Sequence, residues 1–235
     1  MPRPRRFLLS NQSRAFVPTD ISGLALWLDA SDAASLTLDG SNNVSQWSDK
    51  SGNARNVTQS NFFRRPSYTA ASQINGVNVV KFDGTDDLLT AYFTSIPQPA
   101  TVFVVARFGS LTGFRVLYDS LSTNPHGMYT SGTVLVLEAG SSLNINGGTV
   151  TVNASLLASG VYNSTSSILR LNRTQIASGN AGAFALTNGI SFGANRNGSA
   201  PFQGDIAEFA YYSRVLTAGE ITQVEDYLKN KWGTP

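Results

Sequence analysis

Short apolar runs, with polar residues at alternate positions or at their ends, recur along most of the chain. They are rich in β-branched and aromatic residues and are bounded by glycine, asparagine, aspartate or serine, which is the pattern of strands joined by tight turns. The clearest predicted strands are GLALWLD (23–29), NVVKF (78–82), TVFVVARF (101–108), TVLVLEA (133–139), SILRLN (167–172) and DIAEFAYY (205–212). The sequence therefore predicts an all-β protein.

Two of these runs predict different surroundings for their strands. The segment TVFVVA is apolar on both faces, which is typical of a strand covered on both sides. In contrast, SILRLN alternates Leu169 and Leu171 with Arg170 and Asn172, as expected for a strand with one solvent-facing side. The residues NRT at 172–174 then predict a tight turn back into QIAS.

One helix is predicted at the end of the chain, in LTAGEITQVEDYLKNKWG (216–233). Thr217 and Glu220 have the spacing of a capping box, in which each side chain accepts a hydrogen bond from a free backbone N–H. Gly233 stands where a helix of this length would end with a left-handed residue. An apolar stripe at helical spacing predicts that the helix packs on the sandwich, and it consists of Ile221, Val224, Leu228 and Trp232.

Composition limits the classes of protein that remain. A chain of 235 residues is ordinary for one large β-sandwich, and no linker or fixed-period repeat divides the body. The chain has no cysteine, so disulfides and thiolate metal sites are excluded. No apolar run approaches the roughly 18 residues of a membrane span, so we expect no membrane insertion.

Charge is segregated between the first residues and the rest. Residues 1–19 contain four arginines and no acid, whereas the remainder is net negative by about two charges; the arginines are Arg3, Arg5, Arg6 and Arg14. A solvated tail is one interpretation of such a segment. We favour the other, a basic arm that docks on an acidic partner surface. Nucleic acid is not favoured, because no stacking aromatics are interleaved with the arginines.

Catalytic patterns are absent from the sequence. Retaining glycosidases use two carboxyls about 5.5 Å apart, which on one strand requires acids at positions i and i+2. No such pair exists, and Asp205 and Glu208, three positions apart, are predicted to face opposite sides of a strand. The single histidine, His126, lies in a loop-like segment and is predicted to be a polar surface residue. We therefore expect no catalytic residue and no enzyme.

The segment KFDGTDDLL (81–89) places Asp83, Asp86 and Asp87 close together. The spacing does not match the EF-hand loop. Asp-Gly directly after a strand is a strong turn signal, because aspartate side chains accept hydrogen bonds from nearby backbone N–H groups. A turn is the favoured interpretation, calcium binding by these three aspartates is the alternative, and catalysis comes third.

The order of several segments resembles a laminin G-like domain of the concanavalin A-like lectin/glucanase superfamily. The resemblance covers residues 23–233 and rests on LALWLDASD, VSQWSDKSGN, NGVNVVKFDGTDDLL, FQGDIAEF and the capped helix LTAGE. It implies a two-sheet antiparallel jelly-roll sandwich with one C-terminal α-helix, preceded by the extended basic arm. We divide the chain into the arm (1–19) and the sandwich (20–235).

The resemblance also bears on individual residues. It implies that Trp27 and Trp47 pack in the core and that Glu208 makes a structural pairing. The catalytic carboxylate motif of the superfamily's glucanases is absent, and calcium ligands of laminin G-like members cannot be matched beyond the aspartates of 83–87.

Residues suited to sugar binding lie elsewhere. A glycan is held by an aromatic face together with polar groups that bond its hydroxyls, and the residues of this kind that we select are Tyr129, Asn195, Arg196 and Asn197. We regard Tyr129 as a loop aromatic.

Two functions follow from the resemblance and the arm. The first is a structural or adhesion component on a phage virion surface (a fibre, decoration or tail protein), present in several copies or as a homo-oligomer. Its arm would bind other virion proteins while the sandwich faces outward, toward host surface glycans. The alternative is a carbohydrate-binding lectin or adhesin module of a bacterial cell-surface protein, with or without calcium.

Overall fold

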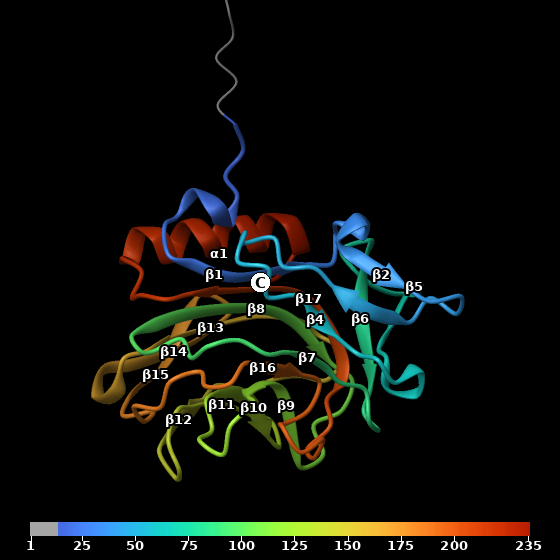
Figure 1. Cartoon of the computed structure of the whole chain (residues 1–235). Helices are drawn as coiled ribbons and strands as arrows, with labels where there is room; N and C mark the ends of the chain where they lie inside the picture. Colours follow the sequence, from blue (N-terminus) through green and yellow to red (C-terminus); the bar gives the residue numbers. More distant parts are fainter. Residues whose placement is uncertain (1–13) are drawn as a thin grey trace, which may run out of the picture.

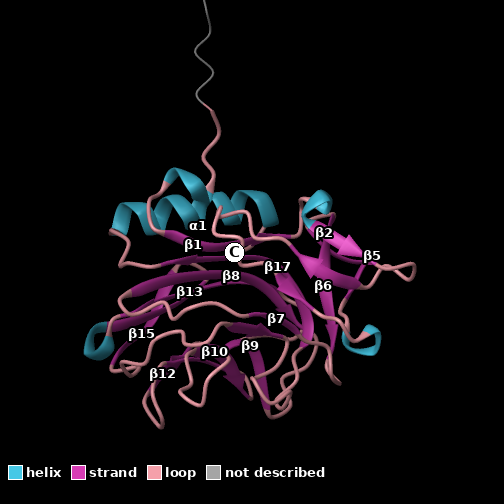
Figure 2. Ribbon diagram, in the orientation of Figure 1, coloured by secondary structure: helices cyan, strands magenta, loops and turns pink. Residues whose placement is uncertain are grey.

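The apolar runs form strands at the predicted positions in the computed structural model, which describes residues 14–235. Two antiparallel sheets face each other and a single long helix covers one of them (Figure 1). Apart from this helix and four short 3-10 turns, the described part is strands and connections (Figure 2). The predicted two-sheet antiparallel sandwich with a C-terminal helix is confirmed.

We call the sheet under the helix sheet A. It has eight strands, and seven of them form a path in this order: β15 (Thr174–Gly179), β14 (Ser167–Leu171), β13 (Ser155–Tyr162), β8 (Ala100–Phe108), β17 (Gln203–Tyr212), β6 (Val77–Asp83) and β5 (Ser67–Ile74). The eighth, β1 (Leu24–Asp29), pairs with the second half of β17. As predicted, β8 is apolar on both faces, because sheet B lies on one side and the helix on the other.

The opposite sheet, sheet B, has nine shorter strands. Their order is β12 (Asn144–Gly147), β11 (Val134–Glu138), β10 (Gly127–Ser131), β9 (Phe114–Ser120), β16 (Ile190–Phe192), β7 (Leu89–Ala91), β4 (Val57–Thr58), β3 (Val44–Trp47) and β2 (Leu36–Leu38). The 3-10 turns are Pro18–Asp20, Ala33–Ser35, Phe62–Arg64 and Ser164–Ser166. No element covers the outer face of β9 to β12 in Figure 1, and this face carries the candidate site described below.

A β-bulge in β17 overturns one prediction. Asp205 pairs with Arg107 and Glu208 pairs with Val105, with one extra residue of β17 between them. Because Arg107 and Val105 are two apart on β8, they point to the same face. Asp205 and Glu208 therefore lie on the same outer face of sheet A, and the expectation of opposite faces was wrong because simple alternation does not hold across a bulge.

The core between the sheets is aromatic. Phe209 of sheet A contacts Tyr118 and Phe192 of sheet B edge-on, with ring centroids 5.1 and 4.8 Å apart. Two buried hydroxyls are satisfied in the same region, since those of Tyr118 and Tyr162 lie 2.6 Å apart and that of Tyr162 donates to the Gly127 carbonyl. Both of these hydroxyls therefore have partners, whereas the buried indole N–H of the core residue Trp47 has none among the described residues.

His126 belongs to this core, and its prediction as a surface residue was wrong. Its ring is fully buried and packs against Tyr162 at a centroid distance of 3.9 Å. The two ring nitrogens bond the Phe184 carbonyl and the Tyr211 hydroxyl. Burial lowers the pKa of His126 to about 4, so the ring is neutral at physiological pH. The polar residues near His126 in sequence suggested a surface position, but tertiary packing buries the ring.

The predicted helix is α1 (Ala218–Trp232). Thr217 caps it by accepting a hydrogen bond from the Glu220 N–H, and the Glu220 carboxylate accepts one from the Thr217 N–H. Gly233 ends it in the left-handed conformation. Of the predicted stripe, Val224, Leu228 and Trp232 are fully buried and Ile221 is half-buried against the core. Cap, stripe and terminus are all as predicted.

Ion pairs also fasten α1 to sheet A. The buried Glu225 carboxylate accepts two hydrogen bonds from the Arg170 guanidinium, at 2.8 and 2.9 Å, and one from the Ser159 hydroxyl at 2.8 Å. Arg170 was predicted to face solvent from β14. Its side chain is instead only 23% exposed, because its guanidinium pairs with the Glu225 carboxylate of α1.

A second buried cluster lies at the end of α1. Glu208 accepts hydrogen bonds from the indole N–H groups of Trp27 and Trp232 and from the Lys231 ammonium, at 2.6–2.8 Å. Lys231 also bonds Asp29, the residue opposite Glu208 on β1. Burial and the neighbouring Asp29 charge raise the pKa of Glu208. Glu208 therefore makes a structural pairing, as the resemblance implied. Trp27 and Trp47 are both buried in the core, which the resemblance also implied.

Within residues 14–235, no helix combines the length and apolar character needed to cross a bilayer. Residues 14–19 approach α1, where the Phe16 ring contacts Tyr227 edge-on at 5.8 Å. The division of the chain at residue 19 stays a prediction.

Candidate functional site

The acidic segment after β6 forms a closed turn. The Asp83 carboxylate accepts a hydrogen bond from the Thr85 N–H at 2.7 Å, and Asp87 accepts one from the Asp83 N–H at 2.8 Å. Gly84 has a φ of +81°, and a side chain there would collide with Gln203. These contacts are those of the predicted turn.

The same three aspartates place carboxylate oxygens within 4.8 Å of one another. This separation suits a cation that takes oxygen ligands, such as calcium. Burial, together with the charges of Asp83 and Asp86, raises the pKa of Asp87 to about 7. Two of the three carboxylates, those of Asp83 and Asp87, already accept backbone hydrogen bonds within the turn. Calcium binding by this segment stays a prediction, which a substitution can test.

Replacing Asp87 by asparagine tests the turn against calcium. The raised pKa means that ionising Asp87 costs folded-state stability as pH rises from about 4 to about 7. Without calcium, we expect the D87N variant to gain stability relative to the parent over this range, by at least about 1 kcal/mol. Urea unfolding at both pH limits, with EDTA and with millimolar calcium, measures the difference. A calcium site would instead make D87N the less stable protein at high pH in calcium.

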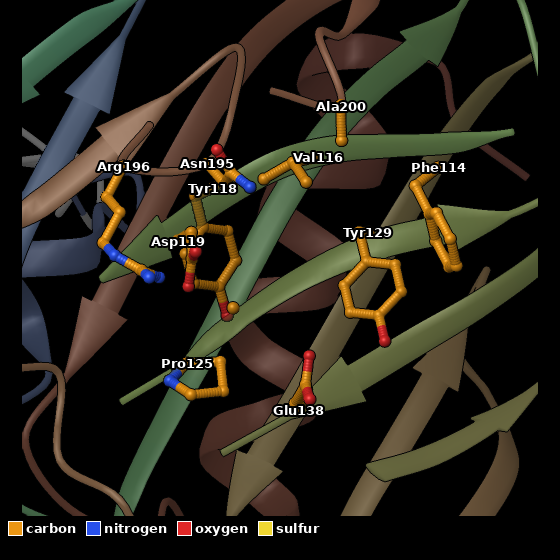
Figure 3. A pocket seen from close by; sticks show the side chains of 11 residues that line it. Phe114, Val116, Tyr118, Asp119, Pro125, Tyr129, Glu138, Asn195, Arg196 and Ala200 are labelled. Atoms are coloured by element: carbon orange, nitrogen blue, oxygen red, sulfur yellow. The ribbon is translucent and has the colours of Figure 1, made fainter. Parts of the chain in front are cut away.

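Polar and aromatic side chains converge on the outer face of sheet B (Figure 3). Here β9, β10, the end of β11 and the loop after β16 enclose a pocket of about 310 Å³. We call it the sheet B pocket. Its lining consists of Phe114, Val116, Tyr118, Asp119, Pro125, Gly127, Tyr129, Glu138, Asn195, Arg196 and Ala200.

Two aromatic rings form its apolar wall. Tyr129 of β10 is half-buried and meets Phe114 of β9 edge-on, with ring centroids 5.8 Å apart. The Phe114 side chain is 58% exposed, which is unusual for a phenylalanine and leaves its face open to a ligand. Burial and the nearby Glu138 carboxylate raise the pKa of Tyr129 to about 12, so its hydroxyl remains a hydrogen-bond donor at physiological pH.

Two carboxylates also line the pocket, Asp119 and Glu138. Asp119 is the second-last residue of β9 and is buried, and one of its oxygens accepts hydrogen bonds from the Ser120 and His126 N–H groups. Glu138 ends β11 and lies beside Tyr129 in Figure 3. Burial raises the pKa of both carboxyls, and the charge of Asp119 raises that of Glu138 further. Each still offers oxygen atoms to a hydroxyl-bearing ligand.

The loop after β16 supplies the remaining polar groups. The Asn195 side-chain oxygen accepts hydrogen bonds from the Asn197 and Ser199 N–H groups, which fixes the loop. Its amide nitrogen has no partner among the described residues and points toward the pocket (Figure 3). Arg196 reaches toward Asp119, and its positive charge partly offsets the rise that burial causes in the Asp119 pKa. Within residues 14–235, Arg196 forms no ion pair within 4.0 Å. These are free donors for a ligand.

Gly127 opens the floor between the two carboxylates. A Cβ atom there would lie 2.4 Å from the Tyr118 carbonyl oxygen and 3.3 Å from the Asp119 carboxylate. The glycine thus lets the Asp119 carboxylate lie against β10, directly across from Glu138, which pairs with Gly127 in the β10–β11 register.

The structure brings three of the four predicted sugar-binding residues to this pocket. Tyr129 is on a strand and not in a loop, so that detail of the prediction was wrong, but it lines the pocket with Asn195 and Arg196. Asn197 is exposed at the loop tip and outside the lining. Sequence reasoning missed Phe114, Asp119 and Glu138, which become neighbours only through strand pairing.

The predicted docking arginines are only partly described. Arg3, Arg5 and Arg6 lie outside the described residues. Arg14 forms an ion pair with Asp20 of the same chain, and its side chain is 72% exposed.

No family model and no curated protein matches this sequence. Solved structures do match its fold. The sialidase of Trypanosoma rangeli aligns with a TM-score of 0.63 and 13% identity over 91% of this chain, which spans about a third (34%) of the sialidase chain. Domain 4 of AbnA, a GH43 extracellular arabinanase from Geobacillus stearothermophilus solved with arabinotriose, aligns with a TM-score of 0.62 and 16% identity, covering 86% of this chain and 98% of that domain.

At these identities the likeness shows the fold alone: a jelly-roll sandwich of the concanavalin A-like kind. Membership of the laminin G-like family stays a prediction.

Proposed function

We propose that this protein binds a glycan in the sheet B pocket and carries out no covalent chemistry on it. The observation that carries the proposal is the composition of that pocket. An exposed aromatic wall of Tyr129 and Phe114 faces two carboxylates and the free donors of Asn195 and Arg196. A sugar ring presents apolar C–H groups on one face and hydroxyls around its edge, so it is complementary to a wall and rim of this kind.

Binding without cleavage is supported by the roles that the carboxylates already have. Hydrolysis by two carboxyls needs one to protonate the leaving oxygen and the other to attack or to activate water. One oxygen of Asp119 accepts hydrogen bonds from the backbone N–H groups of residues 120 and 126, and these bonds fix the orientation of the carboxylate. Glu138 lies beside the Tyr129 hydroxyl, which opposes the rise of the Glu138 pKa. Both are suited to accept hydrogen bonds from sugar hydroxyls.

The setting of this activity is a further part of the proposal. A glycan-binding sandwich fits a surface-exposed module, either on a virion, as a fibre, decoration or tail protein, or on a bacterial cell. The virion assignment depends on the basic arm, most of which lies outside the described residues.

Truncating Tyr129 tests the glycan site. In a screen of neutral and acidic oligosaccharides that includes arabinotriose, we expect binding that the Tyr129→Ala variant weakens at least about tenfold, or about 1.4 kcal/mol. Tyr92→Ala is the matched control, because Tyr92 is 79% exposed and does not line the pocket. Isothermal titration calorimetry gives both affinities.

The same samples test for cleavage. We expect no new reducing ends after prolonged incubation with each bound glycan. Cleavage that disappears in both Asp119→Asn and Glu138→Gln would show an enzyme, and equal affinity of the parent and Tyr129→Ala would remove the pocket from the proposal.

A further inference from the structure

The sheet B pocket continues into a second hollow across the same face. Phe114 and Tyr129 line both, and the second hollow has a volume of about 430 Å³ over β10 to β12. The register explains the continuity, because Tyr129 pairs with Val136, which pairs with Asn146 on the edge strand. Residues opposite one another in adjacent strands point to the same face, so these side chains form one row across the sheet.

The far end of this row is polar. Asn144 and Asn146 are both exposed on β12, and the amide nitrogen of Asn146 donates to the side-chain oxygen of Asn144 at 3.0 Å. This bond orients both amides and leaves the Asn146 oxygen as an acceptor and the Asn144 nitrogen as a donor. Three strand spacings separate β9 from β12, or roughly 14 Å. That span exceeds one sugar ring.

The charges along the two hollows favour a neutral ligand. The charged residues that line them are Asp119, Glu138 and Arg196, so two carboxylates face one guanidinium. A sugar carboxylate would meet this negative excess, whereas neutral sugar hydroxyls would donate to the carboxylates and accept from Arg196.

We propose that the ligand is a neutral glycan chain of two or more units that crosses sheet B from Arg196 to Asn146. One unit occupies the sheet B pocket and the next lies beyond Tyr129 and Phe114, against the two asparagines. This inference rests on the proposed function, whose site it extends from one sugar to a chain.

Chain length and two asparagine substitutions test it. The probes are arabinose, arabinobiose and arabinotriose, a second series of glucose, cellobiose and cellotriose, and sialyllactose as the acidic glycan. By calorimetry we expect a trisaccharide to bind at least about tenfold more tightly than its monosaccharide. In the double variant Asn144→Ala/Asn146→Ala, the trisaccharide should fall to the affinity of the monosaccharide, while the affinity of the monosaccharide is unchanged.

Asn197→Ala is the matched control, since Asn197 is an exposed asparagine beside the pocket that lines neither hollow, and it should leave both affinities unchanged. Three outcomes would overturn the inference and leave glycan binding in place: equal affinity for short and long sugars, a double variant that binds as the parent does, or tighter binding of sialyllactose than of every neutral glycan. Absence of binding by all probes overturns the proposed function and this inference together.

Discussion

Replacing Glu208 by alanine is expected to lower the free energy of unfolding by about 3–5 kcal/mol, the usual cost of removing one partner from a buried ion pair. Glu208 is fully buried, and its carboxylate accepts hydrogen bonds from Trp27, Trp232 and Lys231. Its loss would leave two indole N–H groups without acceptors and reduce the partners of the Lys231 ammonium to Asp29 and the Tyr227 hydroxyl. Buried donors without partners are costly.

Asp226→Asn is the control for Glu208→Ala. Asp226 is on the same helix and pairs with Arg173, but its side chain is 49% exposed. An exposed pair contributes little, so the change should stay below about 1 kcal/mol. Urea unfolding followed by tryptophan fluorescence compares the two variants. Equal losses would mean that the Glu208 cluster does not fasten α1 to sheet A.

The second large effect is a loss of stability in acid that depends on His126. The pKa of this buried ring is about 4 in the folded protein, below the ordinary value of 6.5. Its contribution is complete above pH 6.5, where the ring is neutral in both states. As pH falls from 6.5 toward 4, His126 becomes protonated in the unfolded chain but stays mostly neutral in the folded protein. Stability should therefore fall by about 3 kcal/mol between pH 7 and pH 4.

A comparison with His126→Gln isolates this effect. Because the pKa of Asp87 is raised, its protonation stabilises the folded protein as pH falls over the same range. This gain partly offsets the loss of stability that His126 causes. Glutamine cannot take up a proton, so the difference in unfolding free energy between parent and variant removes the shared contribution of Asp87. We expect this difference to shrink by about 3 kcal/mol from pH 7 to pH 4. A difference that does not change with pH would show that the pKa of His126 is the same in the folded and unfolded states.

Local patterns were sufficient where a structure depends on neighbours in sequence. The capping residues of α1, its buried stripe and the turn after β6 all follow from side chains within a few positions of one another. The burial of β8 on both faces was also predicted, because a strand covered on both sides needs apolar residues at nearly every position.

The rest depends on pairing between distant segments. The bulge in β17 has no clear sequence signal, and it places Asp205 and Glu208 on one face. Glu138 joins Tyr129 and Asp119 only because β11 pairs with β10 and β10 with β9. The polar segment around His126 resembles a surface loop until the packing of Tyr162 and Tyr211 encloses it. Sequence alone therefore selected Tyr129 and two residues of the loop after β16, and it missed the two carboxylates that line the sheet B pocket.

The central claim is that the open face of sheet B holds a glycan and leaves it intact. A crystal structure of the protein grown with its tightest-binding neutral trisaccharide tests this directly. The account predicts an uncleaved chain with one ring against Tyr129, between Arg196 at one end and Asn146 at the other. A sugar bound on another surface, or cleavage products in the sheet B pocket, would contradict it.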